Sequence, residues 1–391
     1  MLEKKALKMS KYLVTLKPLS SFFFGGERTF EFLNTDFEKQ KFNIIKSNMF
    51  PQQTSILGML RKEILIKNKL IKSDLKKYEP EEKAQISKLI GYGSFSINKH
   101  NDFKIIKKIS PVFIGKVTKS NYEFLMRVPK DHDKKEEIFD INRYSSLKFK
   151  KDKVKCNYGI NDHDYDDLTI PCGYDPKAGI SNDFMNIANG VIVKCSDIFI
   201  KENNIGIKVK SKEEKAEDEK TEAKKSNDKS LFRIERYRLR SNFVYAFTVE
   251  IEDKDNEFEN YNSIVSLGGE SSYFSMNFEK VDFDIIDKIK FPFEENEAYK
   301  KMILVSDTYI EKDNNIYSKI PYAITSTVNF RNLRINEGKS DNYFKSFQKS
   351  SEKYSFLERG SVLFVKEDIR NIIRGLSNKE LQKIGYNIFV Y

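Results

Sequence analysis

The strongest constraint on the fold is an alternation of apolar and other residues in the second half of the chain. Large apolar side chains occupy every second position of one segment: Phe243, Tyr245, Phe247, Val249 and Ile251. This period places all of them on one face of a β-strand. Residues 274–278 repeat the pattern, and shorter apolar runs at 302–305, 322–325 and 361–365 predict further strands. The chain must therefore build at least one substantial sheet.

Helices are predicted at only a few places. After Pro51, residues Ile56, Leu57, Leu60, Ile64 and Leu65 form one apolar face, which predicts an amphipathic helix. Residues 81–90, ending before Gly91, and residues 367–376 predict two more helices, and residues 12–19, 104–109 and 111–116 predict strands. Strands interleaved with a few helices indicate the α+β class.

A charged segment divides the chain. Residues 211–230, SKEEKAEDEKTEAKKSNDKS, contain no large apolar side chain, which is typical of a flexible insertion. With 391 residues, the chain is long enough for two domains. We expect an N-terminal domain at 10–200 and a C-terminal domain at 231–391. Residues 130–189 follow no clear period, and we interpret them as long loops and insertions.

Charge and cysteine content bound the function only loosely. Lys and Arg number 69 against 58 Asp and Glu, a net charge of +11, which suits a polyanion such as nucleic acid. Lysine-rich codon usage would give the same balance. The three cysteines lack C-x-x-C spacing, and the chain shows neither an apolar run long enough for a bilayer nor a signal-peptide core. We expect a cytoplasmic protein with reduced thiols.

One stretch near the start combines a strand, a glycine pair and a helix start. KPLSSFFFGGERTF (17–30) is followed by SNMFPQQTSILGMLR (47–61). Gly25 and Gly26 would let a ligand approach the backbone, and Arg28 could bind a phosphate. The helix start at 52–54 would favour an anion. The alternative is a tight turn with a surface Glu27–Arg28 pair and ordinary helix capping.

Three other segments add candidate binding residues. In FRIERYRLRS (232–241), Arg236, Arg238 and Arg240 share one face of a predicted strand and could track a phosphate backbone, although a solvated sheet face is an equal alternative. Tyr237 and Leu239 would then face inward. Gly268–Gly269–Glu270 echoes the first glycine pair, and Arg359–Gly360–Ser361 opens a later strand.

Residues suited to catalysis are few. The three histidines, His100, His132 and His163, lie in charged, loop-like surroundings. The acidic cluster at 161–167 could ligate a metal, but such clusters are more often simply solvated. No nucleophile elbow or metal-binding motif is present. We predict no catalytic residue, no metal and no cofactor.

Taken in order, KPLSSFFFGGERTF, SNMFPQQTSILGMLR, LFRIERYRL, SLGGESSYFSM and SFLERGSVLF resemble one CRISPR protein family. This family is the RAMP-superfamily subunit that caps the crRNA 5′ handle in type III-B (Cmr module) effector complexes. The resemblance runs from about residue 11 to 391. Residues 211–230 and much of 131–175 look like expansions of this chain.

The resemblance implies two ferredoxin-like (RRM-like) domains with long loop and β-hairpin insertions. It implies a non-catalytic, RNA-binding subunit that bridges the large polymerase-cyclase subunit to the backbone RAMP subunits, near target RNA at the guide 5′ end. A β-hairpin thumb would lie within 148–189. The RNA-binding residues would be Gly25, Gly26, Glu27, Arg28, Ser47, Asn48, Gln52, Gln53, Thr54, Arg61, Lys177, Arg236, Arg238, Arg240, Gly268, Gly269, Arg359 and Gly360.

Two alternatives stay open. A metal-independent endoribonuclease of the same superfamily would process CRISPR repeat RNA, but it needs a basic, glycine-rich C-terminal loop and a well-placed histidine. Residues 383–387 contain a single glycine. A protein-interaction scaffold without direct RNA contact is the other alternative.

Overall fold

One large, mainly antiparallel sheet organises the body of the protein. The computed structural model describes residues 8–35, 38–72, 78–91, 93–119, 121–132, 143–158, 161–172, 181–208, 230–253, 256–290, 299–311, 316–330, 333–335, 347–349, 353–366 and 369–391. At the centre of the sheet, β1 (Lys8–Pro18) lies between β13 (Phe243–Asp253) and β15 (Tyr273–Lys280). The strand order is β10-β9-β6-β5-β13-β1-β15-β14, with β4 also paired to β13. The outer strands are β4 (Ile106–Ile109), β5 (Phe113–Val117), β6 (Tyr122–Arg127), β9 (Phe184–Asn186), β10 (Ile192–Val193) and β14 (Asn262–Ser266).

The main core lies between this sheet and helix α1 (Gln53–Lys67). The alternating side chains of β13 pack there against the apolar face of α1, which includes Ile56, Leu60 and Ile64. Both predicted patterns are therefore confirmed, since each placed its apolar residues on the buried side. Helix α2 (Pro80–Ile90), predicted at 81–90, packs beside α1 and begins with a capping box between Glu79 and Glu82.

A second, smaller sheet carries the C-terminal part of the chain. Its order is β17-β22-β16-β23, formed by β17 (Tyr322–Ile324), β22 (Val362–Val365), β16 (Lys300–Leu304) and β23 (Phe389–Val390). Ile372 and Leu376 of helix α5 (Ile369–Leu376) pack in its core, and α6 (Lys379–Gln382) follows. The remaining short elements are α3 (Cys195–Ile198), η3 (Ile285–Lys288), η4 (Tyr317–Lys319), β18 (Thr327–Phe330) with β21 (Tyr354–Leu357), and β19 (Leu333–Ile335) with β20 (Phe347–Lys349).

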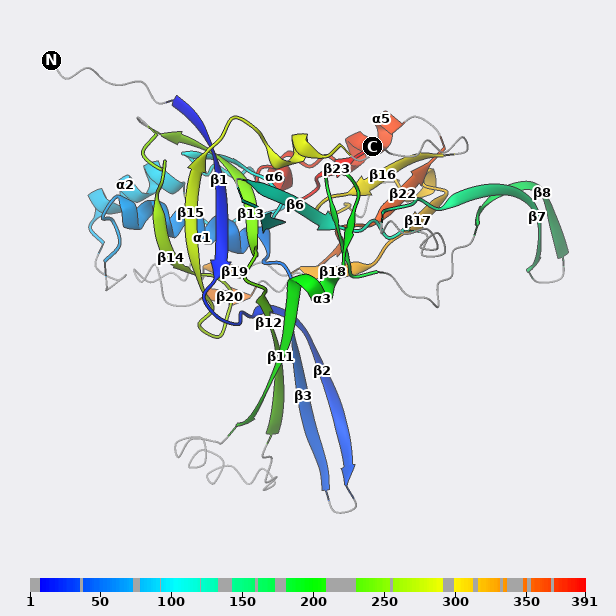
Figure 1. Cartoon of the computed structure of the whole chain (residues 1–391), viewed down its shortest axis with the longest axis horizontal. Helices are drawn as coiled ribbons and strands as arrows, with labels where there is room; N and C mark the ends of the chain where they lie inside the picture. Colours follow the sequence, from blue (N-terminus) through cyan, green and yellow to red (C-terminus); the bar gives the residue numbers. More distant parts are fainter. Residues whose placement is uncertain are drawn as a thin grey trace.

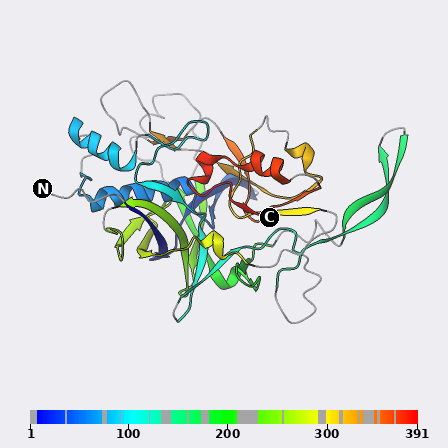
Figure 2. The same ribbon diagram turned by 90° about the horizontal axis from the view of Figure 1, so that it is seen from above.

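Two projections extend from this body (Figure 1). We call the first the four-stranded arm; it consists of β11 (Phe199–Lys208), β12 (Ser230–Leu239), β3 (Glu38–Asn48) and β2 (Phe24–Thr35), in that order. The second, the hairpin arm, is the antiparallel pair β7 (Lys148–Tyr158) and β8 (Asn161–Cys172). Figure 2 shows the hairpin arm leaving the body at one end.

The arms correct two expectations. Residues 25–29 were expected to form a loop, but they lie within β2, and the strand pairing is irregular only between Gly25 and Arg28. Part of 130–189 was interpreted as loops, yet it contains two long strands. The sequences of these strands are rich in charged residues and lack the apolar alternation that predicts a half-buried strand.

The α+β class is confirmed, whereas the two ferredoxin-like domains stay a prediction. The large sheet joins strands from both sides of the expected division between 10–200 and 231–391, because β1 pairs with β13 and β15. The charged segment 211–230 lies outside the described residues apart from Ser230, which begins β12. Among the described residues, no helix combines the length and apolar character that crossing a bilayer requires.

A pH-dependent contact fastens α6 to the body. Burial alone would raise the pKa of Glu380, but hydrogen bonds from Lys383 and from the backbone and side chain of Asn101 hold this pKa at about 2. A carboxylate with a depressed pKa stabilises the fold above its unfolded pKa, and this contribution fades as the pH falls. We expect Glu380→Gln to lower the free energy of unfolding at pH 7, with the difference from the original protein shrinking between about pH 4.5 and 2. Urea titrations across this range will test it; a constant difference would contradict the assignment.

Candidate nucleic-acid interface

Three consecutive phenylalanines fix the entry to the four-stranded arm. Phe22 and Phe24 are buried, with ring centroids 4.8 Å apart, and the Phe24 ring stacks on Phe274 at 5.9 Å. Phe23 is only partly buried, and its backbone N–H donates to Ser272 Oγ at 2.9 Å. Alternating burial therefore anchors the strand immediately before the glycine pair.

The first glycine motif packs against the end of β3. A Cβ on Gly26 would lie 2.7 Å from Lys46 O and 2.8 Å from Asn48 Oδ1, so only glycine fits. Asn48 Nδ2 donates to Gly25 O at 3.0 Å, and Ser47 Oγ accepts from Phe24 N at 2.8 Å. The predicted residues of both stretches are thus brought together here. Arg28 lies further along the arm, where Nη2 donates to Asn43 Oδ1 at 3.3 Å.

The second glycine motif contacts the first. Gly269 N donates to Phe23 O at 2.9 Å, and a Cβ on Gly268, which has φ +92°, would lie 2.4 Å from Phe23 O. Between β14 and β15, this loop therefore lies against the chain just before Gly25. Two glycine pairs more than 240 residues apart form one surface.

Arg236 of β12 lies beside this loop, whereas Arg238 and Arg240 contact β11 and α3. Arg236 Nη2 lies 3.4 Å from Glu270 Oε2, and Arg238 Nη2 lies 2.9 Å from Glu202 Oε1. Arg240, just past the strand, donates from Nε to Ser196 O. Leu239 is buried and Tyr237 packs against the core, as the alternation predicted.

A cavity of about 80 Å³ lies beside Asn48. It joins the end of β3 and the start of α1 to the β21–β22 connection, and its lining is polar and aromatic: Asn48, Met49, Phe50, Pro51, Gln52, Arg127, Asp307, Val328, Asn329, Phe330, Phe356, Glu358, Arg359 and Tyr386. Asn48 therefore belongs both to the surface that the two glycine pairs form and to this cavity. We call the two together the junction cleft.

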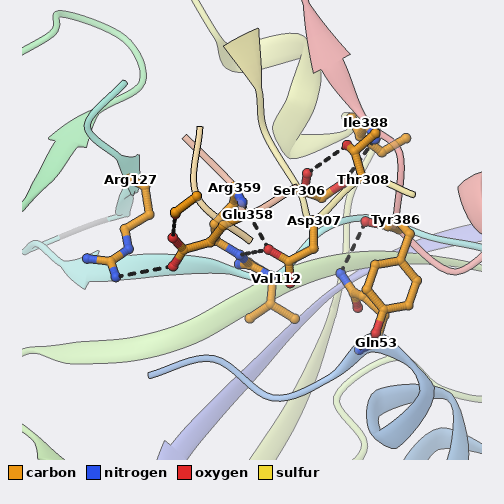
Figure 3. A network of polar contacts seen from close by, with 12 residues as sticks. Gln53, Val112, Arg127, Ser306, Asp307, Thr308, Glu358, Arg359, Tyr386 and Ile388 are labelled. Carbon is orange, nitrogen blue, oxygen red and sulfur yellow. Dashed lines mark hydrogen bonds and ion pairs between the residues drawn. The ribbon is translucent and has the colours of Figure 1, made fainter. Parts of the chain in front are cut away.

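Arg359 lines the cavity and belongs to the network of polar contacts drawn in Figure 3. Its guanidinium lies 4.0 Å from the Phe50 ring centroid, Nη1 donates to Val112 O at 3.0 Å, and Nε lies 3.5 Å from Asp307 Oδ1. Gly360 has φ +83°, and its N–H donates to Leu304 O at 2.7 Å. Arg359–Gly360 thus shapes the cleft, with most of the arginine buried.

Sequence reasoning missed a second group of charges in the cleft. Arg127 Nη2 lies 4.0 Å from Glu358 Oε1, and burial lowers the pKa of Arg127. Burial would raise the pKa of Glu358, but Lys130, with Nζ 2.6 Å from Oε2, helps to lower it below its usual value. The only sequence signals were Arg127 at the end of an apolar strand and Glu358 next to Arg359.

Several predicted residues have other surroundings. Arg61 donates to Gly93 O at 2.9 Å and lies over the Phe103 ring, and burial lowers its pKa to about 10. Gln53 is fully buried, with Nε2 directed at Ser110 O and Gly385 O. Thr54 lies in the first turn of α1. Lys177 lies outside the described residues, and only the backbone of Glu27 is described.

None of the described residues that line the cavity is a histidine. His100 Nδ1 lies 3.1 Å from Glu380 Oε1, and His132 Nδ1 contacts the backbone of Ser145. His163 belongs to β8, where only the backbone is described. Within the part of the chain that the structure describes, no group of three His, Cys, Asp or Glu residues is arranged to hold a metal ion.

Comparison with known proteins gives a family match and matches to chains of solved structures. Residues 14–390 match the model of the CRISPR-associated protein family Cas_Cmr3. A chain of the Type III-B Cmr-beta complex bound to cognate target RNA and AMPPnP is 12% identical, with 97% of this chain and 96% of that chain covered and a TM-score of 0.46. A chain of the same complex bound to cognate target RNA is 14% identical, with the same coverage and a TM-score of 0.44. No curated protein matches. Because the family model spans nearly the whole sequence, the resemblance drawn from the ordered motifs is confirmed, and the chain belongs to the Cas_Cmr3 family of CRISPR-associated proteins.

Proposed function

We propose that this protein is a non-catalytic RNA-binding subunit of a type III-B effector complex, and that it caps the 5′ repeat-derived handle of the crRNA. One observation carries the proposal. Motifs from distant parts of the sequence meet at the junction cleft, including Gly25, Asn48, Gly269 and Arg359. Family membership supports the assignment to a CRISPR effector.

The chemistry of the junction cleft suits single-stranded RNA. Such RNA is bound through stacking on aromatic rings and through contacts to phosphates and 2′-hydroxyls. The cleft combines the buried rings of Phe50 and Phe330 with Arg127, Arg359 and the amide side chains of Asn48 and Asn329. The glycine pairs add backbone that a sugar-phosphate chain can approach closely.

The same features favour binding over cleavage. A metal-independent ribonuclease requires a general acid and base within hydrogen-bonding reach of the scissile phosphate. The described lining of the cavity instead offers arginines that are already paired with Asp307 and Glu358. These ion pairs hold the guanidinium groups in place.

The two arms extend from the body in different directions (Figure 1), which gives the subunit reach toward neighbours. We propose the hairpin arm, within 148–189, as the thumb that enters the guide duplex. The large polymerase-cyclase subunit and the backbone RAMP subunits would then contact the body on either side of the junction cleft. In this arrangement the protein would lie near target RNA at the guide 5′ end.

Reconstitution tests the proposed function. Effector complexes are assembled with and without this protein, and protection of the crRNA 5′ handle from nuclease is mapped. We expect the handle to lose protection when the protein is omitted. Equal protection in both assemblies would overturn the proposal. Specific cutting of repeat RNA by the protein alone, without metal, would favour the endoribonuclease instead.

A single substitution at Arg28 tests whether the four-stranded arm contacts RNA. We expect Arg28→Ala to weaken handle RNA binding roughly fivefold, because one charge-assisted phosphate contact is lost. The slope of log affinity against log salt should become shallower by about 0.7. Arg374, exposed on α5, supplies the matched control, and Arg374→Ala should bind like the original protein. Fluorescence anisotropy measures both; equal affinities for the two variants would argue against RNA contact at Arg28.

A further inference from the structure

Among the described residues, the Nε and Nη2 edge of the Arg236 guanidinium has a single, long contact. Its side chain is 19% exposed, and Nη2 lies 3.4 Å from Glu270 Oε2, at the outer limit of a hydrogen bond. Nε is buried, and no acceptor among the described residues reaches it. A buried donor without a partner is costly, so such a group in a native protein calls for an explanation.

Neighbouring arginines have better partners. Arg238 pairs with Glu202 at 2.9 Å, and Arg359 donates to Val112 O at 3.0 Å while its Nε lies against Asp307. These contacts give the two guanidinium groups close partners within the protein. Arg236 differs because its Nε and Nη2 atoms, the pair that can grip two oxygens of one anion, share only a single long contact.

The backbone that presents Glu270 adopts an unfavourable conformation. Glu270 and Ser271 have φ of +54° and +56°, the left-handed region that L residues adopt at a cost. The loop is fastened on both sides of this pair, since Gly269 N donates to Phe23 O at 2.9 Å and Ser272 Oγ accepts from Phe23 N at 2.9 Å. A half-exposed carboxylate is therefore held beside Arg236 on a tethered loop.

We propose that Arg236 is a phosphodiester subsite, and that the Glu270 carboxylate occupies its place in the RNA-free protein. A phosphate oxygen would take the position of Glu270 Oε2 at Nη2, and a second oxygen would accept from Nε. Glu270 would turn into solvent, which its exposure allows. The inference rests on the proposed function, because it assigns one contact within the RNA interface at the junction cleft.

A double-mutant cycle tests the subsite. Binding of handle RNA is measured for the original protein, Glu270→Gln, Arg236→Gln and the double variant. We expect Glu270→Gln to bind about threefold tighter, because an exposed ion pair no longer competes with the phosphate. Arg236→Gln should bind roughly tenfold more weakly with a salt slope shallower by about 0.7. In the Arg236→Gln background, Glu270→Gln should have no further effect.

Controls separate the possible outcomes. Glu252, ion-paired with Lys107 at the far end of β13, is the matched carboxylate, and Glu252→Gln should leave RNA affinity unchanged. An affinity gain from Glu270→Gln that persists without Arg236 would indicate general repulsion and would overturn the subsite. Original affinity in Arg236→Gln would overturn it as well, while leaving handle binding by the protein intact. If the original protein fails to bind handle RNA, the proposed function fails too.

A free phosphate ion shares the chemistry of a phosphodiester. Calorimetry with inorganic phosphate alone distinguishes the two sources, and we expect no measurable heat of binding. Saturable binding of inorganic phosphate that Arg236→Gln abolishes would overturn the assignment to RNA. RNA binding that persists in excess phosphate, together with the pattern expected from the cycle, would support it.

Discussion

Replacing Asp131 by asparagine is expected to lower the free energy of unfolding by about 3–5 kcal/mol. Asp131 Oδ2 lies 2.8 Å from Lys301 Nζ, and both side chains are almost completely buried. Tyr144 and Ser146 also donate to the carboxylate, at 2.8 and 3.1 Å. The substitution would leave the Lys301 ammonium without its countercharge in a site that excludes water. Urea denaturation of the full chain measures the loss.

Two comparisons make this result specific. Glu123, half-exposed and 3.6 Å from Lys116, forms a surface pair, and Glu123→Gln should cost less than about 1 kcal/mol. The double variant Asp131→Leu with Lys301→Met removes both charges and should be more stable than Asp131→Asn alone. A loss below about 1 kcal/mol for Asp131→Asn would show that Lys301 reaches solvent.

Gly268→Ala is expected to have the second largest effect, a loss of about 2–4 kcal/mol, because a side chain there is strained twice. Its φ of +92° disfavours any L residue, and its Cβ would lie 2.4 Å from Phe23 O and 2.9 Å from Phe24 Cδ1. Relieving the clash would move the loop away from Phe23 and would distort the surface that the two glycine pairs form at the junction cleft. We therefore expect weaker binding of handle RNA together with the lower stability.

Gly58 provides the matched control. It lies in the middle of α1, where an added Cβ has no neighbour within 4 Å among the described residues. Gly58→Ala should raise the free energy of unfolding by about 0.5–1 kcal/mol through helix propensity alone. Thermal and urea unfolding should show that the two substitutions change the free energy of unfolding in opposite directions. A Gly268→Ala protein as stable as the original would mean that the loop adapts without cost.

The sequence predicted strands well where one face is buried. Strand β13 was expected at 243–251 and runs from Phe243 to Asp253. It could be predicted because its alternating apolar side chains are the ones that the core buries. The residue pattern of the hairpin arm did not predict its strands for the opposite reason, although the family resemblance implied a β-hairpin within 148–189. Charged or other polar side chains occupy most positions of KFKKDKVKCNY and NDHDYDDLTI, so these segments lack the apolar alternation that predicts a half-buried strand.

The site could be predicted only as separate pieces. Glycine pairs and arginines were found by residue type, but their convergence depends on contacts such as Gly269 with Phe23, which have no local signal. The same limitation applies to the surroundings of Arg61 and Gln53, because their hydrogen bonds to Gly93 O and Ser110 O have no local sequence signal.

The central position of β1 also governs how the protein can be made. Tyr12 pairs with Val249 on one side and with Lys280 on the other, so the first strand has no described sheet partner until most of the chain exists. At about 5–20 residues per second, a ribosome needs roughly 15–60 s to supply these partners. During this interval the apolar residues of β1 remain uncovered and prone to aggregation. Nascent chains of this protein should therefore depend on chaperones until residue 280 has left the ribosome.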